Sequence, residues 1–274
     1  MKRIPFLKMS GSGNDFIIID NREESLSECN INDVVRSVCR RRFSIGADGL
    51  ILIEHSKKAH FKWHFYNADG SEVGMCGNGA RCAARFAYLK GIASNAMTIE
   101  TKVGIIKAQV DGAQVKIEMS TPEGILLDYN LPVGGKKYLV SHINTGVPHV
   151  VMFVENVEDL DVVGLGRAIR FHERYKPHGC NANFVKTLGN QELAIRTYER
   201  GVEDETLSCG TGAVAAALIS YLKVLVQSPV KVHSKGGEAL MVHFRDKGSR
   251  FTDVFLEGRA RVIYDGELWD EALR

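Results

Sequence analysis

The chain has 274 residues, of which 45% are hydrophobic and 25% are charged, a composition typical of a globular protein. The formal net charge is +2, with lysine and arginine spread along the chain, so we expect no nucleic-acid partner. No run approaches the roughly 18 apolar residues that a membrane helix needs, and the apolar stretch Ile4–Leu7 is too short for a secretion signal. We therefore expect a cytoplasmic protein with no membrane partner.

Strands are predicted where β-branched residues or alternating apolar residues cluster, and helices where Ala- and Leu-rich runs follow a Cys-Gly-x-Gly turn. In chain order the predicted strands are Phe16–Ile19, Leu50–Ile53, Ile105–Val110, Val115–Met119, Val150–Val154 and Leu193–Tyr198. The two clearest helices are Ala80–Leu89 and Ala213–Leu225. The second helix has almost no polar face, so we expect it to be buried on most sides and wrapped by sheet. A turn-like breaker at residues 121–124 marks the expected domain boundary.

The chain contains an internal repeat. CGNGARCAARFAYLK from Cys76 and CGTGAVAAALISYLK from Cys209 share nine identical positions at a spacing of 133 residues. At the same spacing Gly13 corresponds to Gly146, and each of these glycines precedes an apolar, strand-like run. This period is longer than that of solenoid repeats. The repeat predicts two halves of like topology.

Six cysteines occur without CxxC pairs or a histidine-rich cluster, so the sequence predicts no metal site. In a reducing compartment a cysteine usually packs as a small apolar residue. Core packing is the expectation for four of them, Cys29, Cys39, Cys82 and Cys180.

Cys76 and Cys209 have a different setting, because each directly precedes a predicted helix and is followed by Gly-x-Gly. A sulfur placed there lies near unpaired backbone N–H groups and the positive end of the helix dipole. We expect this setting to favour the thiolate and to lower the thiol pKa from about 8.5. The same N–H groups can hold a substrate carboxylate. Two such sites in two like halves predict a cleft with one thiol facing in from each side.

Paired thiols suit inversion at the α-carbon of an amino acid, where one group removes the proton and an opposed group returns one. The α-C–H is far less acidic than any protein side chain, so N–H donors on the carboxylate must stabilise the carbanion. The sequence offers no cue for a Schiff-base lysine and no complete dinucleotide fingerprint. We therefore expect an isomerase that needs no cofactor.

Three motifs resemble those of diaminopimelate epimerases: SGSGNDF at 10–16, FYNADGSEVGMCGNGARCAARF at 65–86 and YERGVEDETLSCGTGA at 198–213. The similarity extends over nearly the whole chain. It implies an α/β (α+β) fold of two pseudo-symmetric domains, each a rolled, mostly antiparallel sheet around a central helix. The implied domains are 1–120, joined by a returning C-terminal strand 262–274, and 121–261.

The resemblance also implies interconversion of LL- and meso-2,6-diaminoheptanedioate, a step of lysine and peptidoglycan precursor biosynthesis. Cys76 and Cys209 become the catalytic acid/base pair, and His149 and Glu199 are expected to tune the protonation of the cysteines. The substrate is a diamino dicarboxylate, whose second zwitterion needs a cation for its carboxylate and acceptors for its ammonium. The expected substrate-binding residues are Asn14, Asn67, Gly77, Asn78, Asn181, Glu199, Arg200, Gly210 and Thr211.

One departure from the family pattern keeps a second function open. Where the family commonly has Gly-Asn-Pro-His, this chain has Val147 in place of the Asn, so a substrate-binding amide is absent. The alternative is a cofactor-independent racemase or epimerase of another amino acid on the same fold. A hydrolase or transferase with one nucleophilic cysteine would leave the second Cys-Gly-x-Gly without a role. The sequence leaves open whether the chain works as a monomer or a homodimer.

Overall fold

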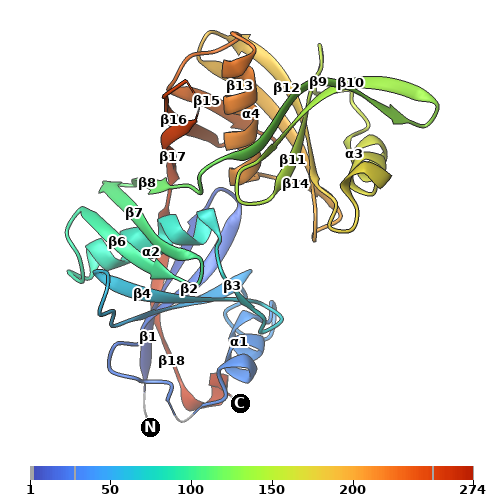
Figure 1. Cartoon of the computed structure of the whole chain (residues 1–274). Coiled ribbons are helices and arrows are strands. Elements are labelled where there is room, and N and C mark those ends of the chain that lie inside the picture. The colour runs from blue at the N-terminus through green and yellow to red at the C-terminus, as the bar shows by residue number, and fades with distance from the viewer. Residues whose placement is uncertain (1–2, 28, 249, 274) are drawn as a thin grey trace. The chain divides into compact units, whose positions relative to one another are not determined.

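The computed structural model describes residues 3–27, 29–248 and 250–273, which form two compact units (Figure 1). The first unit contains the residues up to Ile117 and those from Gly258 onward, and the second is Glu118–Glu257. Most described residues outside loops are in strands, and the described part of the chain has four α-helices. This mixed α/β composition agrees with the expected fold class.

In the first unit, strands surround one helix and a second helix packs outside them. The elements are β1 (Ile4–Gly11), β2 (Asn14–Asp20), α1 (Ile31–Cys39), β3 (Gly49–Glu54), β4 (Phe61–Asn67), β5 (Glu72–Val73), α2 (Gly77–Leu89), β6 (Ala96–Thr101), β7 (Gly104–Asp111), β8 (Gln114–Glu118) and β18 (Arg261–Leu268). β18 pairs antiparallel with β1, so the C-terminal strand belongs to this unit (Figure 1). The pairs β2–β3 and β4–β6 are parallel, whereas β1–β2, β3–β4, β4–β5, β6–β7 and β7–β8 are antiparallel.

The second unit repeats this plan. Its elements are β9 (Glu123–Val133), β10 (Lys136–Asn144), β11 (Pro148–Phe153), α3 (Val162–Arg170), β12 (Asn181–Gly189), β13 (Glu192–Glu199), β14 (Asp204–Thr206), α4 (Gly210–Leu222), β15 (Val230–Ser234), β16 (Ala239–Asp246) and β17 (Phe251–Arg259). The parallel pairs are β11–β12 and β13–β15, at the positions that β2–β3 and β4–β6 hold in the first unit. The expected pseudo-symmetric, mostly antiparallel topology is confirmed.

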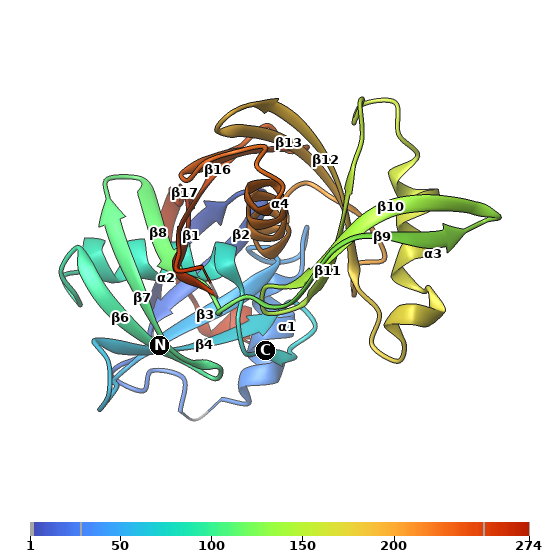
Figure 2. The same cartoon turned by 45° about the horizontal axis from the view of Figure 1, so that its top comes forward.

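Helix α4 lies at the centre of its unit because nearly every side chain on it is apolar or small. Its residues from Gly212 to Ser220 are buried, and Figure 2 shows strands of the same unit around it. Helix α2 is likewise buried from Asn78 to Ala84. Both helices begin at the glycine after the cysteine, three residues before the predicted start. Helix α4 ends three residues before the predicted end, because Val224 adopts a φ of 59°, which a right-handed helix cannot accommodate.

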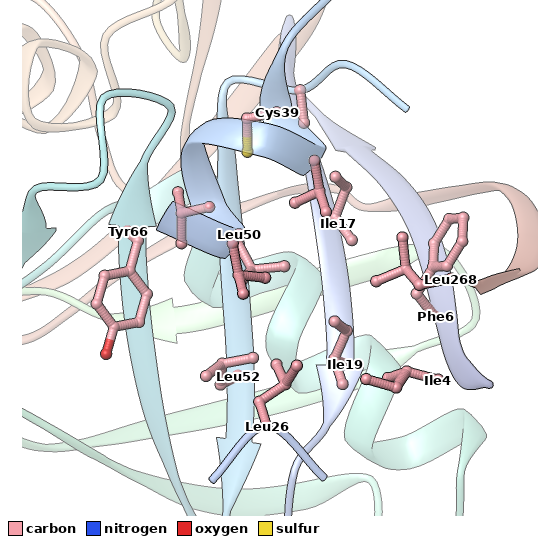
Figure 3. Packing of buried hydrophobic residues seen from close by; sticks show 14 residues of the cluster. Ile4, Phe6, Ile17, Ile19, Leu26, Cys39, Leu50, Leu52, Tyr66 and Leu268 are labelled. Atoms are coloured by element: carbon pink, nitrogen blue, oxygen red, sulfur yellow. The ribbon is translucent and has the colours of Figure 1, made fainter. Parts of the chain in front are cut away.

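A second helix covers the outer face of each sheet. In the first unit α1 packs on β2 and β3 through a core cluster that includes Ile17, Ile19 and Leu50 (Figure 3). Phe16 and Ile18 of β2 are also buried but lie outside this cluster, since neighbouring residues of a strand face opposite sides. Both faces of the sheet are therefore covered, which explains why its strands read as continuous apolar runs.

The outer helices were not predicted from the sequence. Helix α3 contains Gly164 and Gly166, which weaken the helical signal of its sequence. Gly166 has a packing role, because a Cβ added there would lie 2.4 Å from Cβ of Tyr198. The predicted strands, by contrast, all match observed strands to within two residues at each end.

We expect Gly166→Ala to destabilise the protein by about 1–3 kcal/mol, because the new methyl group forces α3 away from β13. Urea unfolding would measure the change. Gly189→Ala is the matched control, since a Cβ added at Gly189 meets no atom within 4 Å. Equal stability of the two variants would contradict the close contact between α3 and Tyr198.

Candidate functional site

Cys76 is the N-cap residue of α2, with extended backbone angles (φ −146°, ψ 115°). Its Sγ accepts a hydrogen bond from the backbone N–H of Gly79 at 3.5 Å. A residue in this position lies beside the unpaired N–H groups of the first helical turn. The structure therefore gives Cys76 the helix N-terminal setting that the sequence predicted, with its side chain half-buried.

Two predicted substrate-binding residues of the first unit, Asn14 and Asn78, lie side by side. Asn78 Nδ2 donates to Asn14 Oδ1 at 2.8 Å, and Asn14 Nδ2 donates to Asp48 Oδ2 at 3.0 Å. The fully buried Arg81 donates from Nη2 to Asn78 Oδ1 at 2.7 Å. These bonds fix both amides at the start of α2.

A cluster of charged residues that the sequence did not predict joins β1, β2 and the segment between α1 and β3. Lys8 and Arg41 bind the carboxylate of Asp15 at 2.8 and 2.5 Å, and Arg41 also binds Asp48 at 2.9 Å. Burial opposes ionisation of Asp15, but hydrogen bonds from Arg41 and Lys8 hold the pKa of this carboxyl below its usual value. The motif SGSGNDF contains Asp15, but pairing with residues this distant in the sequence has no local signal.

Asn67 lies at the end of β4, in the turn that leads to β5. Its Nδ2 donates to Ser71 Oγ at 3.2 Å, and its backbone N–H donates to the Ser71 carbonyl at 2.9 Å. These contacts stabilise the turn. The role of Asn67 in substrate binding stays a prediction.

Cys209 is the N-cap residue of α4 and is buried, with only 7% of its surface exposed. Its Sγ lies 3.5 Å from Thr211 Oγ1. Burial, together with the negative charge of Glu199, raises the pKa of this thiol to about 12. The expectation that the helix N-terminus lowers the thiol pKa is therefore wrong for Cys209, because desolvation and a neighbouring carboxylate outweigh the helix dipole.

Glu199 is half-buried and lies close to Cys209. Burial raises its pKa, against hydrogen bonds from Thr206 and Cys209 that favour the charged form. Thr206 Oγ1 donates to Glu199 Oε2 at 2.9 Å. A thiol that donates to a carboxylate retains its proton, so the protonation states of Cys209 and Glu199 depend on each other.

Asn181, Glu199 and Arg200 occupy one region of the second unit. The buried side chain of Asn181 accepts from the backbone N–H of Arg200 at 2.7 Å through Oδ1. The Arg200 guanidinium reaches the carbonyl of His178 at 3.5 Å, a contact too long to fix it firmly. The backbone after β13 is thus held in place, while the guanidinium keeps some freedom.

The glycines after Cys209 are required by close contacts. A Cβ added at Gly210 would lie 2.8 Å from Leu256 Cδ2, and one added at Gly212 would lie 2.5 Å from Asn183 Oδ1. Thr145 Oγ1 donates to the Thr211 carbonyl at 2.9 Å, which anchors the first turn of α4.

His149 is fully buried in β11, and burial lowers its pKa to about 3, so the imidazole is neutral. Its Nδ1 lies 3.0 Å from Asn183 Nδ2, whereas its buried Nε2 has no hydrogen-bond partner within the described residues. Asn183 was not singled out in the sequence, although it lies in the same CNANF segment as Asn181.

The remaining cysteines follow the packing expectation. Cys39 and Cys180 lie in the apolar cores of the two units, and burial raises the pKa of each thiol to about 12. Cys82 is buried in α2, and Cys29 packs against the core of the first unit.

Within the described ranges, no group of three or more His, Cys, Asp and Glu side chains is arranged to hold a metal ion, and no helix is long and apolar enough to cross a membrane.

The burial of His149 predicts that stability depends on pH. Its folded-state pKa lies below the usual value of 6.5, so the unfolded chain binds the proton more readily and stability falls as the pH drops from about 6.5 toward 3. We expect this residue to contribute a slope of up to about 1.4 kcal/mol per pH unit.

Urea unfolding between pH 7 and pH 5 would measure this slope. His149→Gln should reduce it, and the exposed His178→Gln should leave it unchanged. A wild-type slope that persists in His149→Gln would assign the pH dependence to other groups.

Solved structures share this fold at low sequence identity. A phenazine biosynthesis protein of the PhzF family from Bacillus anthracis aligns with a TM-score of 0.70 and 15% identity, covering 98% of this chain and 100% of that one. A probable proline racemase from Agrobacterium radiobacter K84 aligns with a TM-score of 0.69 and 14% identity, covering 98% and 95%. These likenesses establish the fold.

Closer relatives define the class. Diaminopimelate epimerase of Aquifex aeolicus is 47% identical, covering 98% of this chain and 99% of the relative, and that of Archaeoglobus fulgidus is 41% identical, covering 99% of each. The chain is therefore an isomerase of the epimerase class. A sequence profile of diaminopimelate epimerase matches residues 6–125 and 141–263. The chain belongs to the diaminopimelate epimerase family.

Proposed function

We propose that this chain interconverts LL- and meso-2,6-diaminoheptanedioate without a cofactor, with Cys76 and Cys209 as the acid/base pair. The observation that supports this most strongly is that each half begins its central helix with a cysteine N-cap. The reaction would supply the meso isomer for lysine and peptidoglycan precursors. All six cysteines are free thiols, the state that a reducing compartment maintains, and we place the reaction in the cytoplasm.

The two cysteines would start from different protonation states. Removal and return of a proton on opposite faces of one carbon requires one thiolate and one thiol. Because the pKa of Cys209 is raised to about 12, Cys209 enters the reaction as the acid. Cys76, as the thiolate, would then be the base that removes the α-proton. After turnover Cys76 carries a proton and Cys209 is the thiolate, so the two residues exchange roles.

The carbanion would be stabilised through the carboxylate at the reacting centre. The first turns of α2 and α4 offer the N–H groups of Gly77–Asn78 and Gly210–Thr211, and N–H groups at helix starts bind anions well. The amide of Asn14, fixed by Asn78 and Asp48, would line the same site. Donors held in place before the reaction can stabilise the developing charge without reorganisation.

The distal end of the substrate would be recognised by Asn67, Asn181, Glu199 and Arg200. Arg200 supplies the cation that the distal carboxylate requires. The backbone N–H of Arg200 donates to Asn181 Oδ1, and this bond holds the Asn181 side chain beside the end of β13, where Glu199 lies. The loosely held guanidinium would be able to reach a carboxylate.

We expect Cys76→Ala and Cys209→Ala each to lower kcat for epimerisation by at least about 10³-fold, because each removes a group that transfers the proton. Rates would be measured from both stereoisomers. Cys82→Ala is the matched control, as Cys82 lies on α2 and the repeat has alanine at the equivalent position, Ala215. Full activity of either catalytic variant would exclude the two-base mechanism.

We expect Arg200→Met to lower kcat/KM for diaminopimelate by about 10–100-fold, the usual cost of losing a charge-assisted hydrogen bond. Arg200→Lys keeps the charge but loses the planar fork, so its loss should be intermediate. Steady-state kinetics of the three proteins would test this order. Equal values for all three would place the distal carboxylate elsewhere.

Val147 supports a second candidate function, because a valine offers no amide to the substrate. The alternative is racemisation or epimerisation of another amino acid by the same thiol pair. Exchange of the α-proton in heavy water, measured for diaminopimelate and a panel of other amino acids, separates the two. Exchange of another amino acid without exchange of diaminopimelate would replace the proposed substrate and leave the mechanism intact.

A further inference from the structure

Asn183 is hydrogen-bonded inside the second unit through both its amide nitrogen and its amide oxygen. Only 1% of its surface is exposed. Its Nδ2 lies 3.0 Å from His149 Nδ1 and donates to the Val150 carbonyl at 2.9 Å. Its Oδ1 accepts from Thr197 Oγ1 at 3.0 Å. The side chain therefore joins β11, β12 and β13.

These bonds determine which way the amide of Asn183 faces. If the amide were reversed, Oδ1 would face the carbonyl of Val150, and two acceptors would meet without a hydrogen atom between them. The NH₂ group must therefore face both Val150 and His149. Since it donates to His149 Nδ1, that nitrogen is a lone-pair acceptor and carries no proton.

The proton of the neutral imidazole is then on Nε2. This nitrogen is buried and has no hydrogen-bond partner within the part of the chain that the structure describes. A buried donor without a partner is destabilising. The N–H of Nε2 therefore points to an acceptor that arrives with the substrate or with a change in the state of the site. Asn183 thus determines what His149 offers to that group.

Asn183 also contacts the helix that carries Cys209. A Cβ added at Gly212 would lie 2.5 Å from Asn183 Oδ1 and 3.3 Å from Cys209 Sγ. The second glycine of CGTG is therefore needed for Asn183 to approach the first turn of α4. In the first unit the equivalent Gly79 faces apolar atoms of Ile51 and Trp63.

The first unit has no copy of this arrangement. The strand registers align the two units. Phe16 pairs with Gly49 as His149 pairs with Asn181, so His149 corresponds to Phe16 and Asn183 to Ile51. The next strand pair places Asn67 at the position of Glu199. Phe16 and Ile51 are buried, and Asn67 is half-buried. His149 and Asn183 thus occupy positions that are apolar in the first unit, although the strands that carry them are equivalent.

We propose that Asn183 is a positioning residue for the reaction: it fixes the proton of the His149 imidazole on Nε2, beside the start of the helix that Cys209 caps. The rate effect rests on the proposed epimerase function, whereas the tautomer does not. His142 on β10 and Arg200 after β13 are the charged or titratable groups that act on His149 from neighbouring elements.

Nitrogen-15 NMR of histidine-labelled enzyme at pH 7 tests the tautomer directly, with the His149 signals assigned by their loss in His149→Gln. We expect a protonated Nε2 and a bare Nδ1 in the wild type. Asn183→Asp keeps the size of the side chain but replaces the donor with an acceptor, so it should move the proton to Nδ1. A proton on Nδ1 in the wild-type protein would overturn the proposal, even if Asn183→Asp does not fold.

Kinetics supply the second measurement. We expect Asn183→Asp to lower kcat by about 10–100-fold, the usual cost of losing a group that orients a functional side chain, with KM changed less than about threefold. Thr197→Val is the matched control, because it removes the hydrogen bond to Asn183 Oδ1 and leaves the hydrogen bond between Asn183 Nδ2 and His149 Nδ1 intact. Wild-type kcat in Asn183→Asp would overturn the role. If the protein shows the expected tautomers but does not epimerise diaminopimelate, the proposed function would be refuted and the role of Asn183 in setting the tautomer would stand.

Discussion

The chemistry of the second unit depends on one interaction, the contact between the buried Cys209 thiol and the Glu199 carboxyl at the start of α4. A helix N-terminus alone would favour a thiolate. Burial and the carboxylate reverse that preference, so Cys209 retains its proton. The second unit is built to keep this contact: β13 ends at Glu199, Thr206 hydrogen-bonds the carboxyl, and the glycines after Cys209 let α4 begin against its neighbours.

The two halves share their topology but differ in the chemistry around their cysteines. Their strands pair in the same order, and each central helix starts at a cysteine cap. At the cap of the second half, His149 and Asn183 occupy the positions that Phe16 and Ile51 hold in the first half. Glu199 occupies the position of Asn67. A reaction that needs one acid and one base requires two cysteines in different protonation states, and the different surroundings of the two cysteines favour such a difference. Duplication explains the like folds, and substitution at a few buried positions explains the unlike cysteines.

The sequence predicted six of the strands, the two central helices and the repeat, because each depends on local periodicity or on direct self-comparison. It also placed Cys76 and Cys209 at helix starts. It did not predict α1 and α3: α3 is interrupted by two glycines whose value lies in tertiary contacts, such as that of Gly166 with Tyr198. The raised pKa of Cys209 and the role of Asn183 were also missed, because both depend on burial and on contacts between strands that are distant in the sequence.

The proposed mechanism requires two one-proton groups that act on opposite faces of one carbon. Its most direct test is the isotope content of the first turnovers of LL-diaminopimelate in heavy water. A thiol carries a single proton, so the proton removed by one cysteine stays on it, while the opposed thiol delivers a deuteron from solvent. We expect deuterium at the inverted centre of the meso product and none in the remaining substrate. Product that retains the original proton would show that one group both removes and returns it, and would contradict the account.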